Sequence, residues 1–170
     1  MQENCILVDE TDHEIGTEEK MATHERGLLH RAFSVFVFNA SGELLLQQRA
    51  FEKYHSGGLW TNTCCSHPRP GEETLAAAHR RLQEEMGFDC PLKEMFTFRY
   101  FAPFPNGLTE NEVDHVFFGM YDGPVNPNPA EVASTRWISL DALQKDLAGK
   151  PTIYSVWLKE CFGKVKQART

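Results

Sequence analysis

The sequence predicts one α/β or α+β domain, and three observations carry this prediction. Several apolar runs have the composition of strands, and two other segments carry the apolar spacing of helices. The length of 170 residues is that of one ordinary domain, which needs no disulfide scaffold for stability. The chain has no internal repeat, no low-complexity segment and no long linker. We therefore expect a single domain over residues 1–170, with residues 1–19 as an N-terminal extension.

The strands are predicted where Phe- and Val-rich runs are bounded by turn residues. A turn at residues 39–42, with the sequence Asn-Ala-Ser-Gly, separates the first two runs. Strands interleaved with helices are what place the chain in the α/β or α+β class. The predicted strands cover residues 31–39, 43–49, 94–101, 112–121 and 135–140.

The first helix is predicted for residues 71–87, where Gly87 ends the run. A rotation of about 100° per residue places Glu84 nearly opposite the apolar stripe and Glu85 close to Arg81. We expect Glu84 to be solvated and Glu85 to face the functional site. The apolar stripe consists of Leu75, Leu82 and Met86.

The second helix is predicted for residues 152–165, where apolar residues recur at every fourth position. These residues are Ile153, Trp157 and Cys161. An aromatic residue with this spacing is more often a core residue than a functional one. The pattern alone therefore favours a core position for Trp157.

The charge excludes several classes of partner. A net charge of −7 and a pI near 5.5 argue against binding to nucleic acid or to an anionic membrane, since both favour a basic face. An anionic ligand would have to be held by a few local cations. The acidic N-terminus lacks the pattern of a signal peptide, and no apolar run approaches the ~18 residues of a membrane span. We expect a soluble cytoplasmic protein with no nucleic-acid and no membrane partner.

Residues 61–68, with the sequence TNTCCSHP, place two adjacent thiols just before a histidine. Side chains alternate in an extended chain, so Cys65, His67 and Thr63 should share one face and Cys64 should point to the other. The five cysteines are odd in number and irregularly spaced, as is typical of a reducing compartment. We predict that Cys64 is a core residue and that Cys65 has another role.

Two further groups supply residues of the kinds that bind metal ions. Glu110 and Glu112 are two positions apart at the start of a strand and should share a face, and His24 and His30 precede another strand. Each residue alone is more often a solvated or core residue. Together with His67 they form a set of nitrogen and oxygen ligands suited to an octahedral divalent cation such as Mn²⁺, Mg²⁺ or Zn²⁺.

Taken together, these residues resemble the type 1 isopentenyl-diphosphate isomerases, which have a modified Nudix fold. The most specific segments are LLHRAFSVFVFN, LWTNTCCSHP, RRLQEEMG, FRYFA and ENEVDH, and the similarity runs from about residue 20 to residue 157. The resemblance implies a Nudix-like mixed β-sheet sandwiched between helices. It also implies that isopentenyl and dimethylallyl diphosphate are interconverted, for isoprenoid biosynthesis, by metal-dependent protonation and deprotonation through a carbocation.

The resemblance also implies the residues of the site. The acid/base pair would be Cys65 and Glu112, assisted by Tyr100, with Trp157 stabilising the cation. One divalent ion, Mn²⁺, Mg²⁺ or Zn²⁺, would be bound by His24, His30, His67, Glu110 and Glu112. A second ion, Mg²⁺ on the diphosphate, would be held by Glu85. The small-molecule diphosphate substrate would be bound by Lys20, Arg49, Lys53, Ser66 and Arg81.

Two other functions are compatible with parts of the pattern. In a Nudix diphosphate hydrolase, whose box reads G-x5-E-x7-R-E-U-x-E-E-x-G-U, a carboxylate stands where this chain has Arg81. That change favours retention of the diphosphate over its cleavage. A structural metal clasp is the other alternative, but structural zinc sites are usually four-coordinate and rich in sulfur. We expect the protein to be a monomer or a weak homodimer.

Overall fold

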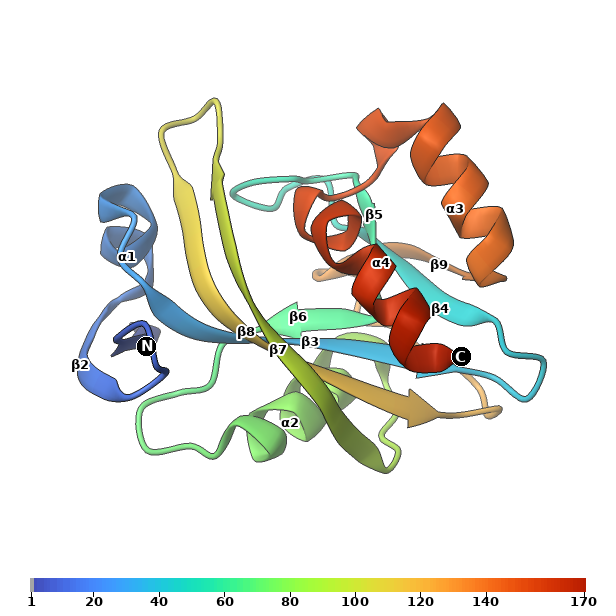
Figure 1. Ribbon diagram of the computed structural model, residues 1–170, viewed down its shortest axis with the longest axis horizontal. Coiled ribbons are helices and arrows are strands. Elements are labelled where there is room, and N and C mark those ends of the chain that lie inside the picture. Colours follow the sequence, from blue (N-terminus) through green and yellow to red (C-terminus); the bar gives the residue numbers. More distant parts are fainter. Residues whose placement is uncertain (1) are drawn as a thin grey trace.

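The structure is a computed structural model that describes residues 2–170 (Figure 1). Within these residues, nine strands form one mixed sheet. The strands are β1 (Asn4–Val8), β2 (Glu14–Glu19), β3 (His30–Phe38), β4 (Leu44–Arg49), β5 (Trp60–Thr61), β6 (Cys64–Ser66), β7 (Leu92–Pro103), β8 (Thr109–Met120) and β9 (Val132–Ile138). The helices are α1 (Lys20–Arg26), α2 (Thr74–Met86), α3 (Leu140–Gly149), the short 3₁₀ turn η1 (Pro151–Ile153) and α4 (Val156–Arg169).

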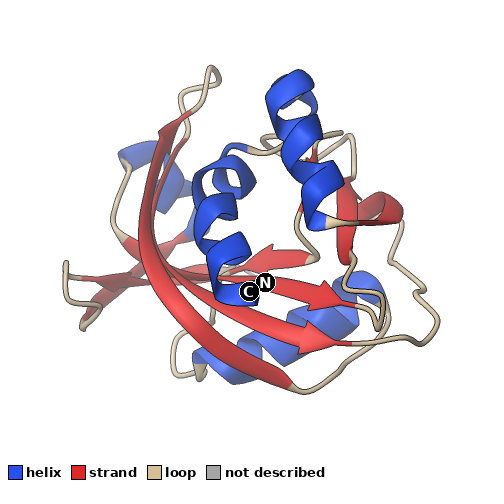
Figure 2. Ribbon diagram, turned by 45° about the vertical axis from the view of Figure 1, so that its right-hand side comes forward, coloured by secondary structure: helices blue, strands red, loops and turns tan. Residues whose placement is uncertain are grey.

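Helices cover both faces of the sheet, as Figures 1 and 2 show. Helix α2 packs on one face, and helices α3 and α4 lie over the other. Alternation along β3 supplies both cores, because Val35 and Val37 pack with α2 whereas Phe36 and Phe38 pack with α4. The predicted mixed sheet between helices is confirmed.

The centre of the sheet is a parallel pair, β3 and β8, which are far apart in the sequence. Their register places His30 beside Glu112 at one end of the pair and Phe38 beside Met120 at the other. Strand β7 pairs antiparallel with β8, so that Tyr100 lies opposite Glu112. The polar end of this three-strand unit is where the candidate site forms.

All five predicted strands and both predicted helices are present, with ends that shift by a few residues. The N-terminal segment, expected as an extension, forms the β1–β2 hairpin, and β1 joins the sheet through the pairing of Leu7 with His30. Strands β5 and β6 and helices α1 and α3 were not predicted as separate elements. Each spans ten residues or fewer, which is too short for a clear periodic pattern.

Two details of the helices differ from the prediction. The apolar stripe of α2 is buried only from its second turn onward, and Leu75 in the first turn is 43% exposed. Ile153 belongs to η1 rather than to the second predicted helix and is 37% exposed. Helix α4 begins after Ser155, whose hydroxyl accepts a hydrogen bond from the Leu158 amide and so caps the helix.

Gly87 ends α2 as predicted, with a positive φ of 74°. A β-carbon at this position would lie 2.1 Å from the Asn126 carbonyl oxygen, so the close approach also requires glycine. All five cysteines are free. Among the helices of residues 2–170, none is long and apolar enough to cross a membrane.

Candidate active site

The two neighbouring cysteines lie on opposite faces of β6. Cys64 is fully buried in the core beside α2, whereas Cys65 lines a small cavity beside α4. This confirms the predicted separation of the two thiols. His67 lines the same cavity as Cys65. Thr63 does not line it, because its hydroxyl group is engaged by the backbone of Leu45 and Val37.

The Cys65 thiol is held in a defined position by Asn62. The sulfur donates a hydrogen bond to Asn62 Oδ1 at 3.0 Å, and the Asn62 amide group donates to the Val35 and Cys64 carbonyl oxygens. Burial raises the pKa of Cys65 well above its usual value, so the thiol is protonated at neutral pH. Cys65 therefore carries a proton that it can donate.

Three predicted histidines come together from three parts of the chain. His24 lies on α1, His30 begins β3 and His67 follows β6. Their ring centroids are 4.9 to 5.5 Å apart. Glu112 joins them from β8, and ligand atoms of these four residues all lie within 4.8 Å of one another.

Backbone hydrogen bonds orient two of these imidazoles. His24 Nδ1 donates to the Lys20 carbonyl oxygen at 2.6 Å, and His30 Nδ1 donates to that of Leu28 at 2.8 Å. Each ring therefore directs Nε2, the nitrogen left to bind a metal ion, toward the cluster. Both Nε2 atoms are buried and lack a hydrogen-bond partner among residues 2–170. Buried nitrogen lone pairs without a partner fit the residues to a divalent metal ion.

The protonation states also fit a metal ion. Burial raises the pKa of Glu112, but contacts with His30 and His67 outweigh this effect and hold the pKa below its usual value. Burial lowers the pKa of His67 to about 3 and also lowers that of His24. At neutral pH Glu112 is a carboxylate and His24 and His67 are neutral imidazoles, which are the forms that bind metal ions. Burial lowers the pKa of His30, but contacts with Glu112 outweigh this effect and raise it, so a bound ion would compete with a proton at this ring.

Glu110 shares the face of Glu112, as predicted, but its nearest charged or ligating partner is a residue that the sequence did not indicate. Glu110 Oε1 lies 2.8 Å from Nε2 of His55, which is in the loop between β4 and β5. Ligand atoms of Glu110, His55 and His24 form a second group within 4.8 Å. Burial raises the pKa of Glu110, and the negative charge of Glu112 nearby raises it further.

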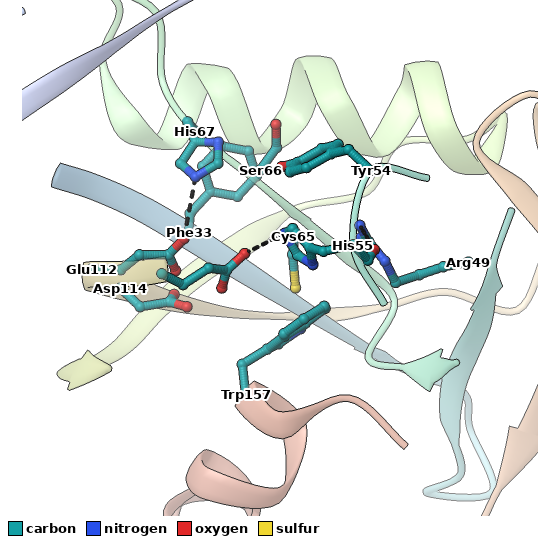
Figure 3. Close-up of a pocket in the computed structure, with 11 residues that line it drawn as sticks. Phe33, Arg49, Tyr54, His55, Cys65, Ser66, His67, Glu112, Asp114 and Trp157 are labelled. Atoms are coloured by element: carbon teal, nitrogen blue, oxygen red, sulfur yellow. Dashed lines mark hydrogen bonds and ion pairs between the residues drawn. The ribbon is translucent and has the colours of Figure 1, made fainter. Parts of the chain in front are cut away.

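The cavity that these groups line is small, at about 40 Å³ (Figure 3). In Figure 3 the Cys65 sulfur points toward Trp157 of α4, which closes one side. Arg49 stacks over this indole, with the guanidinium carbon 5.2 Å from the ring centroid. Other lining residues include Ser66, Glu110, Glu112 and Asp114.

A larger cleft of about 360 Å³ adjoins this cavity and shares Ser66 and His67 with it. Its walls carry a concentration of positive charge that is unusual for an acidic chain. The cations are Lys20, Arg69, Arg80 and Arg81. Of these, Arg69 is the one without an ion pair among residues 2–170. The cleft is therefore suited to an anion.

Two predicted residues lie outside both cavities because other groups hold them. Glu85 was expected to face the functional site, but it is buried and accepts hydrogen bonds from Arg81 at 2.6 Å and Gln47 at 2.9 Å. Lys53 forms an ion pair with Glu131. Glu84 is exposed, as predicted.

Tyr100 and Arg81 have surroundings that the sequence did not indicate. Tyr100 is buried opposite Glu112, and its hydroxyl has no hydrogen-bond partner among residues 2–170. Arg81 lines the larger cleft, but Glu84 and Glu85 both accept hydrogen bonds from it at 2.6 Å. The carboxylates of Glu84 and Glu85 on α2 therefore offset part of the positive charge of Arg81.

Sequence reasoning missed Asp114, Ser34 and Asn62 around Cys65. Asp114 continues the alternation of Glu110 and Glu112 along β8, so this pattern could have revealed it. Ser34 donates to Asp114 at 2.8 Å, and its oxygen lies 3.4 Å from the Cys65 sulfur.

Comparison with known proteins agrees with this fold and site. The NUDIX domain family matches residues 28–158, so the protein is of the Nudix class. Isopentenyl-diphosphate Delta-isomerase 2 of Aromatoleum aromaticum is 53% identical over 170 residues, which cover 100% of this chain and 90% of that protein. Isopentenyl-diphosphate Delta-isomerase of Serratia proteamaculans is 52% identical over 92% of this chain and 88% of its own length. The chain belongs to the isopentenyl-diphosphate Delta-isomerase family, as its motifs predicted.

Solved structures support the fold alone. The protein DR0079 from Deinococcus radiodurans has a TM-score of 0.80 at 20% identity, with 95% of this chain and 98% of that chain covered. A MutT protein from Methanosarcina mazei has a TM-score of 0.67 at 18% identity, with coverages of 82% and 94%.

Proposed function

We propose that this protein interconverts isopentenyl diphosphate and dimethylallyl diphosphate by moving a proton on and off the carbon chain. One observation carries the proposal. A protonated thiol, Cys65, and an ionised carboxylate, Glu112, line one small cavity that Trp157 closes. The names of the relatives support the choice of substrate.

The two groups can act as acid and base because they are in different protonation states. Cys65 lies on β6 and Glu112 on β8, on either side of β3, so they approach a bound carbon chain from different strands. Cys65 can donate a proton to a double bond, and Glu112 can accept one from a neighbouring carbon. The roles exchange in the reverse direction.

Protonation of an unactivated double bond gives a tertiary carbocation, which water would capture. A cavity of about 40 Å³ has space for only a few water molecules. The indole face of Trp157 can stabilise the cation by ~2 kcal/mol or more in a dry site. The carbon chain of the substrate needs more room, so its binding must move the lining side chains apart.

The His/Glu cluster would hold one divalent ion, Mn²⁺, Mg²⁺ or Zn²⁺, through His24, His30, His67, Glu112 and Glu110. When bound, this ion supplies positive charge beside Glu112. The buried histidines fix the orientation of the Glu112 carboxylate, with His67 Nε2 at 3.2 Å and His30 Nε2 at 3.4 Å from its Oε1. Tyr100, directly opposite on β7, would support the same carboxylate.

The diphosphate would lie in the adjoining cleft, where four cations and Ser66 surround space of about 360 Å³. Mg²⁺ bound to the diphosphate would offset part of its charge. Arg49, in the smaller cavity, would reach the same group from the other side. Lys53 and Glu85 lie outside both cavities, so we assign them no direct contact in this arrangement.

The alternative, hydrolysis of the diphosphate, is disfavoured by the contacts of Arg81. Its guanidinium group binds Glu84 and Glu85, the helix carboxylates that match the end of the Nudix box. A paired carboxylate is less available to gather metal ions. The contacts of Arg81 therefore favour isomerisation over hydrolysis.

Incubation with isopentenyl diphosphate in heavy water tests the choice. An isomerase exchanges hydrogen with solvent, so we expect dimethylallyl diphosphate with deuterium in a methyl group. Mass spectrometry reads the label, and phosphorus NMR reads the diphosphate in the same sample. Phosphate release from an unlabelled carbon chain would contradict the proposal and establish a hydrolase.

The variant Arg69→Ala tests the assignment of the cleft. Arg69 is the cleft cation without an ion pair among residues 2–170, so its charge is free to bind phosphate. Loss of a hydrogen bond to a charged group costs ~1.5–3 kcal/mol, so we expect KM to rise about 10- to 100-fold while kcat changes little. Steady-state kinetics measures both values. Arg99→Ala, on the exposed side of β7, is the matched control. An unchanged KM in Arg69→Ala would place the diphosphate elsewhere.

A further inference from the structure

His55 is a buried histidine with a fixed orientation beside the proposed metal site. It is 6% exposed, and its ring stacks on Phe104 with centroids 4.6 Å apart and planes at 11°. Trp157 contacts it edge-on at 5.9 Å. These aromatic neighbours hold the ring with Nε2 toward Glu110. Figure 3 shows His55 on the wall of the cavity near Trp157.

The contact between His55 and Glu110 does not have the geometry of an ordinary hydrogen bond. His55 Nε2 and Glu110 Oε1 are 2.8 Å apart, yet Nε2 is buried without a well-directed hydrogen-bond partner among residues 2–170. Adjacent ligands of an octahedral ion, each at about 2.1 Å from it, lie about 3.0 Å apart without pointing at each other. The spacing of these two atoms is therefore that of two ligands of one ion.

His24 connects this pair to the rest of the cluster. Ligand atoms of His24, His55 and Glu110 lie within 4.8 Å of one another, and His24 also belongs to the group with His30, His67 and Glu112. Since His24 Nδ1 donates to a backbone carbonyl oxygen, Nε2 is its one free lone pair, and it can bind a single ion. The two groups therefore serve the same ion.

We propose that His55 is a sixth protein ligand of this ion, which completes an octahedral shell and leaves no position for water. The proposal rests on the divalent-metal site of the proposed function. It also separates this site from hydrolytic ones, because catalytic metal sites that activate water keep an open position. The six ligands are His24, His30, His55, His67, Glu110 and Glu112.

Binding of Mn²⁺ alone tests this shell, with EPR spectra recorded in water enriched in oxygen-17. Bound water broadens the Mn²⁺ lines, so we expect no broadening in the unsubstituted protein. In His55→Phe, which keeps an aromatic ring on Phe104, water should enter the vacated position and broaden the lines. The Kd for Mn²⁺ should rise at least 10- to 100-fold. His79→Phe, on the surface of α2, is the control and should match the unsubstituted protein.

A second variant covers the case in which His55→Phe does not fold. In His55→Gln, pulsed EPR should count three coupled imidazoles in place of four. Inner-sphere water in the unsubstituted protein, or an unchanged imidazole count in His55→Gln, would overturn the proposal. The variant His30→Gln distinguishes failure of the metal site as a whole from failure of the role of His55. If the unsubstituted protein binds no Mn²⁺, the metal site itself fails; if His30→Gln weakens Mn²⁺ binding but His55→Gln leaves both the Kd and the imidazole count unchanged, the role of His55 alone fails.

Discussion

Replacement of Cys65 by alanine is expected to lower kcat by at least the ~10²–10⁴-fold typical of a lost general acid or base. Cys65 is the protonated thiol that lines the cavity, and no neighbouring group replaces it in the same position. Cys64→Ala should keep most of the activity, because Cys64 is fully buried on the opposite face of β6. Steady-state turnover of the purified variants measures the contrast.

The pair of cysteine variants also controls for stability. Both substitutions remove one sulfur atom from the same strand, that of Cys64 from the core and that of Cys65 from the cavity wall, so thermal unfolding should change little in either variant. Equal losses of turnover in the two variants, with both folded, would refute the assignment of separate roles to the two faces.

Replacement of Glu112 by glutamine is expected to abolish measurable turnover and also to weaken the retention of metal. The amide cannot take up a proton as the carboxylate does, and it supplies no negative charge to an ion among three histidines. Turnover and metal content should be measured on the same preparation. Glu94→Gln, on the exposed part of β7, is the control and should behave as the unsubstituted protein.

The two readouts separate the two roles of this residue. If inactive Glu112→Gln retained one ion per chain with unchanged affinity, Glu112 would act on the proton without being an essential ligand. If turnover persisted, the base would be another residue of the cavity, and Glu110 and Asp114 are both carboxylates two positions away on the same face of β8.

Much of the site was predictable from the sequence because regular strands fix where side chains point. The two-residue spacing of Glu110 and Glu112 and the alternation of Cys64 and Cys65 need only an extended backbone. The structure gives both arrangements as expected. The convergence of His24 and His30 on Glu112 depends instead on the resemblance to a family, since no local pattern specifies the pairing of β3 with β8.

What was missed depends on partners that are distant in the sequence. His55 lies in an irregular loop, where no periodicity indicates the direction of a side chain. The resemblance to the family assigns Lys53 and Glu85 to the substrate and its ion, but it does not indicate their partners in the structure, Glu131 and Gln47. Such contacts form only when the tertiary structure is complete, so composition and spacing do not reveal them.

The parallel pairing of β3 with β8 has a consequence for the order in which the chain folds. His30 and Glu112 are neighbours across this pair, although the whole chain between the two strands separates them in the sequence. Pairings of such high contact order form slowly. An ion held by both residues needs the two strands to be paired, so it favours the folded sheet over the unfolded chain. Mass action then makes the ion a stabiliser of the native state, by about 2.7 kcal/mol when its free concentration is a hundred times Kd.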